Sequence, residues 1–220
     1  MEVMHIVSHR RSIRRFKSTP IPREDIEKMV QAAALAPSGG NVQPWHFLAI
    51  TNQKKRDEMV SLIHNRGLAV LRPIHGENTP RFILPSLVFS TAPLVFAVLY
   101  TPFPLDKDPG FLAFQKNHTE NKQQKLKVEK EKKSNMDSYG GFVNIQSVAA
   151  AIENLLLRAC DLGYGSCWLR IPYYAKDDLE EFLQVSSPWE LLALVPVGIP
   201  DQNPSPPPRK HIEEVLTYLE

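Results

Sequence analysis

The chain has 220 residues, of which 43% are hydrophobic and 23% charged, and its net charge is +2 with the histidines neutral. This length and composition are typical of one globular domain with a full core, so we expect a single domain over residues 1–220. The near-balanced charge argues against a nucleic-acid-binding protein, and no apolar run is long enough to span a bilayer.

The N-terminal residues MEVMHIVSHRRS place histidine and arginine where a signal peptide needs an apolar stretch, so we expect a cytoplasmic protein. The two cysteines, Cys160 and Cys167, are too few for a disulfide framework and lack the CxxC spacing. We interpret them as two buried thiols. Since the sequence offers no four-ligand cluster, we expect no metal site.

The first motif along the chain is basic. Residues 9–17, HRRSIRRFK, hold five basic residues between Arg10 and Lys17 and no acidic residue. Arginine forks and a serine hydroxyl match the geometry of phosphate, and the segment has no glycine-rich loop that would hold a phosphate by its backbone. The candidate phosphate ligands are therefore side chains: Arg10, Arg11, Ser12 and Arg14. Considered alone, the segment fits a solvated basic surface better.

A helix and a turn follow the basic segment. Residues 23–36 predict a helix, because acidic residues fill the first turn and the apolar residues Ile26, Met29, Val30 and Ala33 share one face. Pro37, Gly39 and Gly40 end the helix. Residues 45–51, WHFLAIT, predict a buried strand, and residues from about 54 to 65 predict a second helix.

The turn between that helix and strand is a candidate ligand loop. Ser38, Gly39, Gly40 and Asn41 have small side chains, which lets backbone N–H groups approach a planar polar ligand closely. Asn41 and Gln43 each donate and accept hydrogen bonds, which suits a ring edge that carries N–H and C=O groups. An ordinary turn with favourable residues is an equally good interpretation of this segment alone.

The second half of the chain continues the alternation of strands and helices. Strands are predicted over 94–100, 166–171 and 191–199, and helices over 143–162 and 176–184. The segment 143–162 is nearly apolar all round, so we interpret it as the buried central helix. Strands separated by helices predict a mixed α/β layered domain.

Two segments fall outside this pattern. Residues 101–139 form a polar insertion, and seven lysines and three glutamates lie between Gln115 and Lys133. We expect this insertion to influence the substrate and not the cofactor. The stretch from Pro196 to Pro208 holds six prolines and must be extended, and the sequence RKHIEEVL after it is a short amphipathic piece.

The motifs together resemble the FMN-dependent nitroreductase family. RRSIRRF followed by a helix that ends in APSGGNVQPWHF is similar to the N-terminal half of that family. VAAAIENLLLRACDLGYGSCWL and VPVGIPDQNPSPPPRK are similar to its central helix with the strand that follows, and to its C-terminal strand with a basic extension. The resemblance covers nearly the whole chain, and only the insertion at about 101–139 falls outside it.

The resemblance implies an α+β fold with a central, mostly antiparallel sheet flanked by helices, and a homodimer in which the C-terminal extension embraces the partner subunit. FMN would lie at the dimer interface, with residues of both chains around it. The residues that the resemblance implies for one side of the flavin are Arg10, Arg11, Ser12, Arg14, Gly165, Leu169, Arg209 and Lys210. Those implied from the other subunit are Pro37, Ser38, Gly39 and Asn41.

Arg14 is the candidate catalytic residue, because a cation at the pyrimidine edge of the flavin would stabilise the negative charge that develops on reduction. The resemblance implies a ping-pong transfer of hydride from NAD(P)H through flavin N5 to a small conjugated acceptor, either a nitroaromatic or a quinone. A backbone N–H of residues 169–171 would bond N5, in a register that the sequence leaves open. Reductive dehalogenation, enone reduction and dehydrogenation remain alternative reactions, and a non-enzymatic basic binding module is an alternative of another class.

The chain departs from the family pattern at two places. Pro37-Ser38-Gly39 stands where many members have Pro-Ser-Ser, so one hydroxyl is missing. Arg170 falls near a position where some members carry Glu or Gly close to the flavin. A cation there either favours an acidic substrate or points away from the site.

Overall fold

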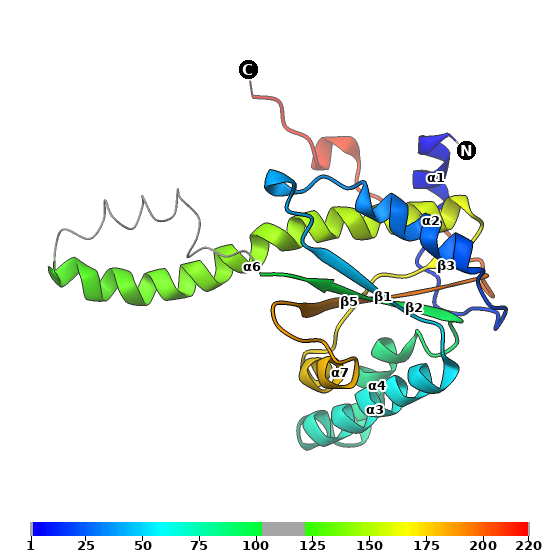
Figure 1. Cartoon of the computed structure of the whole chain (residues 1–220), viewed down its shortest axis with the longest axis horizontal. Coiled ribbons are helices and arrows are strands. Elements are labelled where there is room, and N and C mark those ends of the chain that lie inside the picture. The colour runs from blue at the N-terminus through cyan, green and yellow to red at the C-terminus, as the bar shows by residue number, and fades with distance from the viewer. Residues whose placement is uncertain (1, 103–121, 220) are drawn as a thin grey trace.

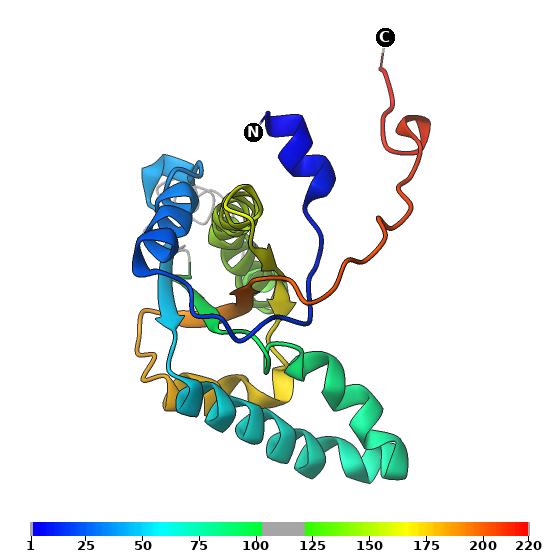
Figure 2. The same cartoon turned by 90° about the vertical axis from the view of Figure 1, so that its right-hand side faces the viewer.

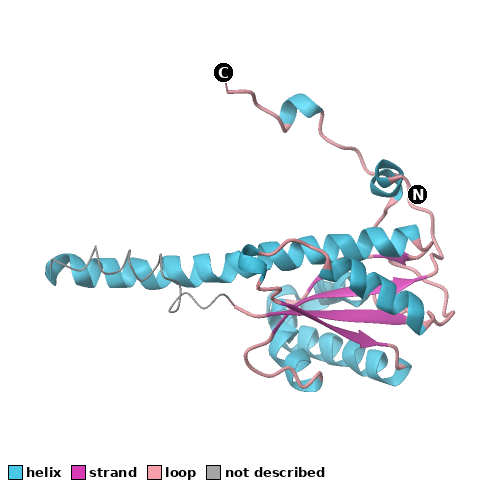
Figure 3. Cartoon of the chain, turned by 45° about the horizontal axis from the view of Figure 1, so that its top comes forward, coloured by secondary structure: helices cyan, strands magenta, loops and turns pink. Residues whose placement is uncertain are grey.

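The protein is a three-layer structure with one sheet between two layers of helices. The computed structural model describes residues 2–102 and 122–219, with side chains at 2–102 and 142–219. Figure 1 and Figure 3 show α2 (Arg23–Ala34) and α6 (Lys122–Asp161) on one face of the sheet. The other face carries α3 (Gln53–His75), α4 (Thr79–Ile83) and α7 (Lys176–Phe182). The insertion predicted at 101–139 lies largely outside the residues with described side chains.

The sheet is built around two long apolar strands. Its order is β1 (Trp45–Ile50), β2 (Leu94–Tyr100), β5 (Glu190–Gly198) and β3 (Gly165–Ser166), and β4 (Leu169–Arg170) also pairs with β5. Every pairing between these described strands is antiparallel. The expected α+β fold with an antiparallel sheet is therefore confirmed. The expectation of helices and strands in layers, drawn from their alternation in the sequence, is also met.

The predicted strand over 166–171 is divided in two. Ser166 pairs with Val197 and Leu169 pairs with Leu194, so β3 and β4 keep one continuous register along β5. The ladder breaks between them, opposite Pro196, whose ring nitrogen has no hydrogen to donate. Cys167 N–H still donates to the Pro196 carbonyl at 3.2 Å. Trp168, in this gap between β3 and β4, is exposed.

The predicted helices are all present in the structure, but several of them begin or end at other residues than predicted. The helix predicted over 23–36 is α2, whose Met29 and Ala33 are buried. The helix predicted from about 54 to 65 continues ten residues further, to His75, and passes Gly67 and Pro73. Glycine and proline are helix breakers in sequence, but Gly67 lies where a side chain would collide with Ile83, only 2.8 Å away. Tertiary packing therefore overrides propensity here.

The central helix α6 is buried on one face only in the single chain. Its residues against the sheet are fully or nearly fully buried, namely Val148, Ala151, Ile152, Leu155, Leu156 and Ala159. On its other side Leu157 is only half-buried and Phe142 is 62% exposed. The prediction of a buried helix is thus met on the sheet side, and the outer face is covered only in part, by Val3 and Ile6, which line a pocket together with Leu157.

Both ends of the chain leave the body of the domain. Figure 2 shows α1 (Val3–His9) and the C-terminal tail projecting from the same side of the body. No residue of α1 is buried. The predicted extended tail is confirmed over residues 201–211, and the short helical turn η6 (Ile212–Glu214) follows it. Exposed apolar residues cluster on both projections and include Val3, Met4, Val215 and Leu219.

Candidate active site

The basic segment is fixed against the short edge strand. The backbone N–H of Ile13 donates to the Ser166 carbonyl at 2.9 Å, and Ser12 forms a parallel bridge with Ser166. The Ile13 side chain is buried beneath the segment. Because alternate residues of an extended chain point to opposite sides, this anchor directs Arg14 outward, and Arg14 is exposed. The positions of the basic side chains are therefore set by β3.

A cavity of about 370 Å³ opens beside this anchor. Of the predicted site residues, Arg10, Arg11 and Gly165 line it. Residues that the sequence analysis did not assign to the site also line it: His9, Cys160, Tyr164, Ser166, Gln202 and Asn203. Two guanidinium groups, two amides and the Ser166 hydroxyl around one cavity form a set of donors that suits an anionic, phosphate-bearing ligand.

The two arginines of the cavity are held differently. The Arg11 guanidinium donates to the carbonyls of Ser8 at 2.7 Å and of Arg10 at 2.8 Å. Arg10 Nε lies 3.3 Å from Glu153 Oε1 on the outer face of α6. Since both contacts use only part of each guanidinium, further N–H donors are left for a ligand.

The cavity wall also contains a hydrogen-bonded tyrosine. The Tyr164 hydroxyl donates to Asp25 Oδ2 at 2.8 Å and so ties the end of α6 to the first turn of α2. Burial and this hydrogen bond raise the pKa of Tyr164 to about 12, and the bonds from Tyr164 and Lys28 lower the pKa of Asp25. Burial raises the pKa of the Cys160 thiol, so Cys160 lines the cavity as a neutral group.

Gly165 lets the basic segment pass close to β3. A Cβ atom at Gly165 would lie 2.6 Å from Cγ1 and 2.8 Å from Cβ of Ile13. We expect Gly165→Ala to displace the segment and to destabilise the fold by about 1–3 kcal/mol, the usual cost of overpacking. Thermal unfolding measures this loss. Gly39→Ala is the control, because no atom lies within 4 Å of a Cβ at Gly39, and an equal loss there would contradict the explanation.

The loop after α2 has an unusual backbone. Gly40, Asn41 and Gln43 all have positive φ, with values of 57°, 55° and 48°. Asparagine tolerates this left-handed conformation, but for Gln43 it is unfavourable, and such strain is characteristic of functional loops. The Ser38 hydroxyl accepts from the Gln43 N–H at 3.0 Å, so this side chain holds the loop in shape. Pro37, Gly39 and Asn41 are exposed at its surface.

One chain does not bring this loop to the basic segment. Tyr164 after α6 bonds Asp25 in the first turn of α2, whereas Asn154 within α6 bonds the carbonyl of Ala32 in the last turn. The two helices are therefore antiparallel, and the loop lies beyond the far end of α2 (Figure 1). Among the described residues, no hydrogen bond or ion pair joins residues 38–41 to residues 10–14.

The edge strand β4 pairs with β5 in a defined register. Leu169 lies opposite Leu194 and packs in the core on the α3 side of the sheet, while Arg170 lies opposite Ala193 and is exposed. Alternation puts Trp168, 41% exposed, on the same side of the strand as Arg170. Arg170 makes no hydrogen bond or ion pair with any described residue.

Arg209 and Lys210 lie away from the cavity in the single chain. Pro204 is the last tail residue that lines the cavity, and Arg209 follows five residues later. An extended chain covers about 16 Å in that distance. Both side chains are exposed on the projecting tail. The structure thus brings together Arg10, Arg11, Ser12 and Gly165, and leaves Arg209, Lys210 and the loop outside.

Sequence reasoning missed the cavity residues from α6 and from the start of the tail. Tyr164 stands between two glycines and reads as part of a turn, and Gln202 and Asn203 are polar residues of a proline-rich segment. No pattern within either segment signals that they meet the basic segment. Among the residues that the structure describes, no group of acidic, histidine or cysteine side chains could hold a metal ion. Within residues 2–102 and 122–219, none of the helices has the length and hydrophobicity needed to cross a membrane.

Known proteins give an independent comparison. The model of the Nitroreductase family matches residues 7–199. The structure of a BluB-like flavoprotein from Clostridium difficile 630 superposes with a TM-score of 0.81 at 29% identity, over 100% of both chains. A protein of Archaeoglobus fulgidus, provisionally named NADH dehydrogenase/NAD(P)H nitroreductase, is 29% identical over 203 residues, 90% of this chain and 86% of its own. The iodotyrosine deiodinase of Thermotoga neapolitana is 24% identical over 217 residues, 94% of this chain and 93% of its own.

Proposed function

The chain belongs to the nitroreductase family, and from this membership we propose that it is an FMN-dependent oxidoreductase that works as a homodimer. The observation that carries the proposal is the cavity beside β3, where Arg10 and Arg11 meet the amides of Gln202 and Asn203. Guanidinium and amide donors around a space of about 370 Å³ suit the phosphate end of a flavin nucleotide. The likeness to a flavoprotein over the whole chain supports the same cofactor.

When bound, FMN would supply the redox chemistry, namely hydride acceptance and the passage of electrons to an acceptor. The protein supplies binding and electrostatics. Arg10, Arg11 and Ser12 would hold the phosphate and the ribityl chain, and Arg14 would lie at the pyrimidine edge. The edge strand from Gly165 to Arg170 would run along the ring, with a backbone N–H of residues 169–171 toward N5.

Support for the homodimer comes from apolar side chains that the single chain leaves exposed. Phe142 of α6 is 62% exposed, and Val3 and Met4 of α1 and Val215 and Leu219 of the tail are exposed as well. In the proposed dimer, the tail embraces the second copy, which would bring Arg209 and Lys210 to the phosphate. Ser38, Gly39 and Asn41 of the partner subunit would approach the ring, with Pro37 at the start of their loop.

For the electron donor and the acceptor, the proposal extends only to their chemical classes. NAD(P)H is supported by the name of the archaeal relative. The acceptor would be a small conjugated compound of the nitroaromatic or quinone type. The cytoplasmic location is part of the same proposal, and the two free cysteines fit a reducing compartment. Family membership argues against the non-enzymatic basic binding module.

Reductive dehalogenation is a second candidate reaction, because a relative that matches 94% of the chain is named an iodotyrosine deiodinase. Release of halide from a haloaromatic under anaerobic reduction would favour this reaction. Reduction of nitroaromatics or quinones without halide release from haloaromatics would favour the first.

Titration of flavin-free protein with FMN tests the proposal directly. We expect stoichiometric quenching of FMN fluorescence, and we expect Arg10→Ala to weaken binding by about 10- to 100-fold, since hydrogen bonds to charged groups contribute about 1.5–3 kcal/mol. Arg23→Ala is the matched control, because Arg23 is 90% exposed and pairs only within its own helix, with Glu27. A colourless protein that leaves FMN fluorescence unchanged would refute the flavin assignment.

A further inference from the structure

The end of α3 and the short helix α4 form a corner that stands out from the domain. The first part of α3 packs on the sheet through Arg56, Met59 and Ile63. From Leu68 onward the helix carries mainly exposed residues, and α4 folds back beside it. We call residues 68–84 the α3–α4 corner. It lies on the opposite face of the sheet from α2 and α6 (Figure 1), and none of its residues lines the cavity around Arg10.

The corner has a fixed shape. Ile83 is fully buried against Gly67 of α3, where a side chain would not fit. The turn between the helices is closed by the Thr79 hydroxyl, which donates to the Gly76 carbonyl at 2.6 Å. Thr79 is 1% exposed, and Gly76 has a φ of 53°, which glycine adopts without strain. The side chains on the corner are therefore presented by a rigid backbone.

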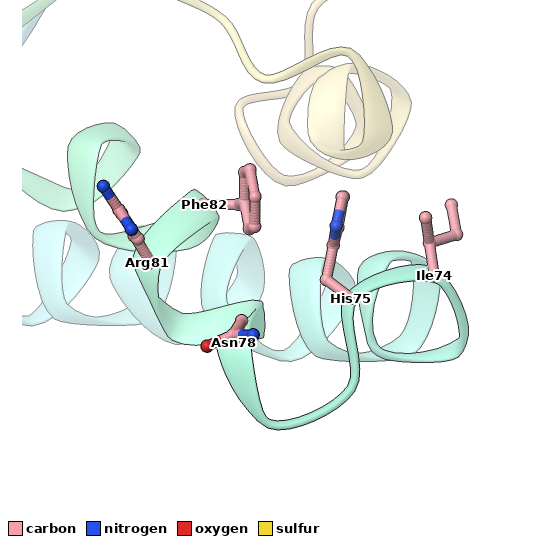
Figure 4. Close-up of a pocket in the computed structure, with 5 residues that line it drawn as sticks. All are labelled: Ile74, His75, Asn78, Arg81 and Phe82. Atoms are coloured by element: carbon pink, nitrogen blue, oxygen red, sulfur yellow. The ribbon is translucent and has the colours of Figure 1, made fainter.

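A pocket of about 580 Å³ lies on this corner, lined by Ile74, His75, Asn78, Arg81 and Phe82. Figure 4 shows Phe82, His75 and Ile74 projecting to the same side of the two helices, with Arg81 beside them. The rings of His75 and Phe82 are stacked, with centroids 3.9 Å apart and an angle of 19° between their planes. The stacked pair presents a preformed aromatic wall.

Apolar side chains of this pocket are exposed to solvent in the single chain. Ile74 is 71% exposed and Phe82 48%, and Val70 and Leu84 nearby are also exposed. Apolar groups gathered in this way beside polar ones mark binding sites more often than inert surface. Arg81 makes no hydrogen bond or ion pair with any described residue, whereas the neighbouring Arg72 is paired with Glu77 at 3.8 Å. The charge left over in the pocket is therefore positive.

We propose that the pocket on the α3–α4 corner binds a planar aromatic carboxylate. The ring contacts Phe82 and His75, where aromatic groups pack favourably at their edges and faces. The carboxylate accepts from the Arg81 guanidinium, whose fork matches its two oxygens, and Asn78 offers an additional amide donor. A neutral aromatic compound lacks the contact with Arg81, and an aliphatic carboxylate lacks the contact with the two rings.

Calorimetric titration of the FMN-loaded protein without any reductant tests this proposal, with 4-nitrobenzoate as the probe and 4-nitrobenzyl alcohol as its neutral match. We expect saturable binding of 4-nitrobenzoate that is at least tenfold tighter than that of the alcohol, and weaker at high salt. Arg81→Ala and Phe82→Ala should each weaken the binding of 4-nitrobenzoate by at least tenfold. Arg72→Ala removes an exposed, paired arginine from the same corner and should leave the affinity unchanged.

Two results would overturn the proposal: no saturable binding of 4-nitrobenzoate, or an affinity that neither Arg81→Ala nor Phe82→Ala changes. The visible flavin spectrum, recorded in the same samples, separates this site from the cofactor site, since a ligand at the corner leaves that spectrum unchanged. FMN content is measured for each variant and should equal that of the unmodified protein. A chain that binds no FMN fails the proposed function but can still be titrated at the corner.

Discussion

Deletion of residues 205–220 is expected to yield a monomer that no longer retains FMN. The tail makes its last backbone contact with the body at Asp201, whose N–H donates to the Arg15 carbonyl at 3.0 Å. The domain itself should therefore stay folded without the tail. Beyond that contact, the exposed apolar residues Ile212, Val215 and Leu219 have no surface to cover within the described part of the chain. In the proposed dimer, a second copy would supply such a surface along α1 and the outer face of α6.

The measurement is light scattering together with the flavin absorbance of the same sample. Arg209→Ala keeps the tail and removes one proposed phosphate ligand, so it should remain dimeric while it binds FMN less tightly. Ile212→Asp with Leu216→Asp keeps the length of the tail and removes its apolar contacts, so it should dissociate, whereas Glu213→Gln should not. A truncated chain that is still dimeric and yellow would show that the tail is not part of the interface.

The local elements of the fold could be predicted from the sequence because each is specified by neighbouring residues. The run LVFAVLY from Leu94 to Tyr100 is apolar throughout and bounded by prolines, and it became β2 over the same residues. Helix α2 has its acidic first turn and its glycine-rich end within one segment. In both cases the pattern that predicts the element lies inside the element.

Other features depend on residues far apart in the chain. The break between β3 and β4 arises opposite Pro196, thirty residues after Ser166, and the extension of α3 past Gly67 depends on Ile83. The distance between the loop at Ser38 and the segment at Arg10 depends on the antiparallel packing of α2 on α6. The sequence shows both motifs but gives no measure of their separation, which the packing of the two helices sets.

The same distinction applies within the candidate site. Arg10, Arg11 and Ser12 are contiguous, and a basic cluster is visible as such in the sequence. Tyr164, Gln202 and Asn203 join them only because β3 and β5 are neighbours in the sheet. The wall of the cavity is thus a product of strand order, which residue types at local spacing do not encode.

Arg14→Ala is expected to lower the reduction potential of bound FMN by tens of millivolts and to slow its reduction by NAD(P)H. Arg14 is exposed and is held only by a hydrogen bond of 3.4 Å to the Ser12 carbonyl, so its charge is not neutralised by any described acidic group. At the pyrimidine edge, this charge would act on the negative charge that appears there on reduction. For a two-electron couple, about 30 mV corresponds to about 1.4 kcal/mol.

The phosphate of FMN keeps its charge through the redox cycle, and this separates the roles of the arginines. An interaction that is equal in both redox states changes binding alone, whereas one that strengthens on reduction changes the rate and the potential. Arg10→Ala and Arg209→Ala should therefore weaken FMN retention with little change in potential. Arg15→Ala removes the adjacent exposed cation and is the matched control for Arg14→Ala. Potentiometric titration of each variant, fully loaded with FMN, measures the reduction potential. If Arg209→Ala lowers this potential and Arg14→Ala does not, the proposed positions of the two arginines, at the phosphate and at the ring edge, are reversed.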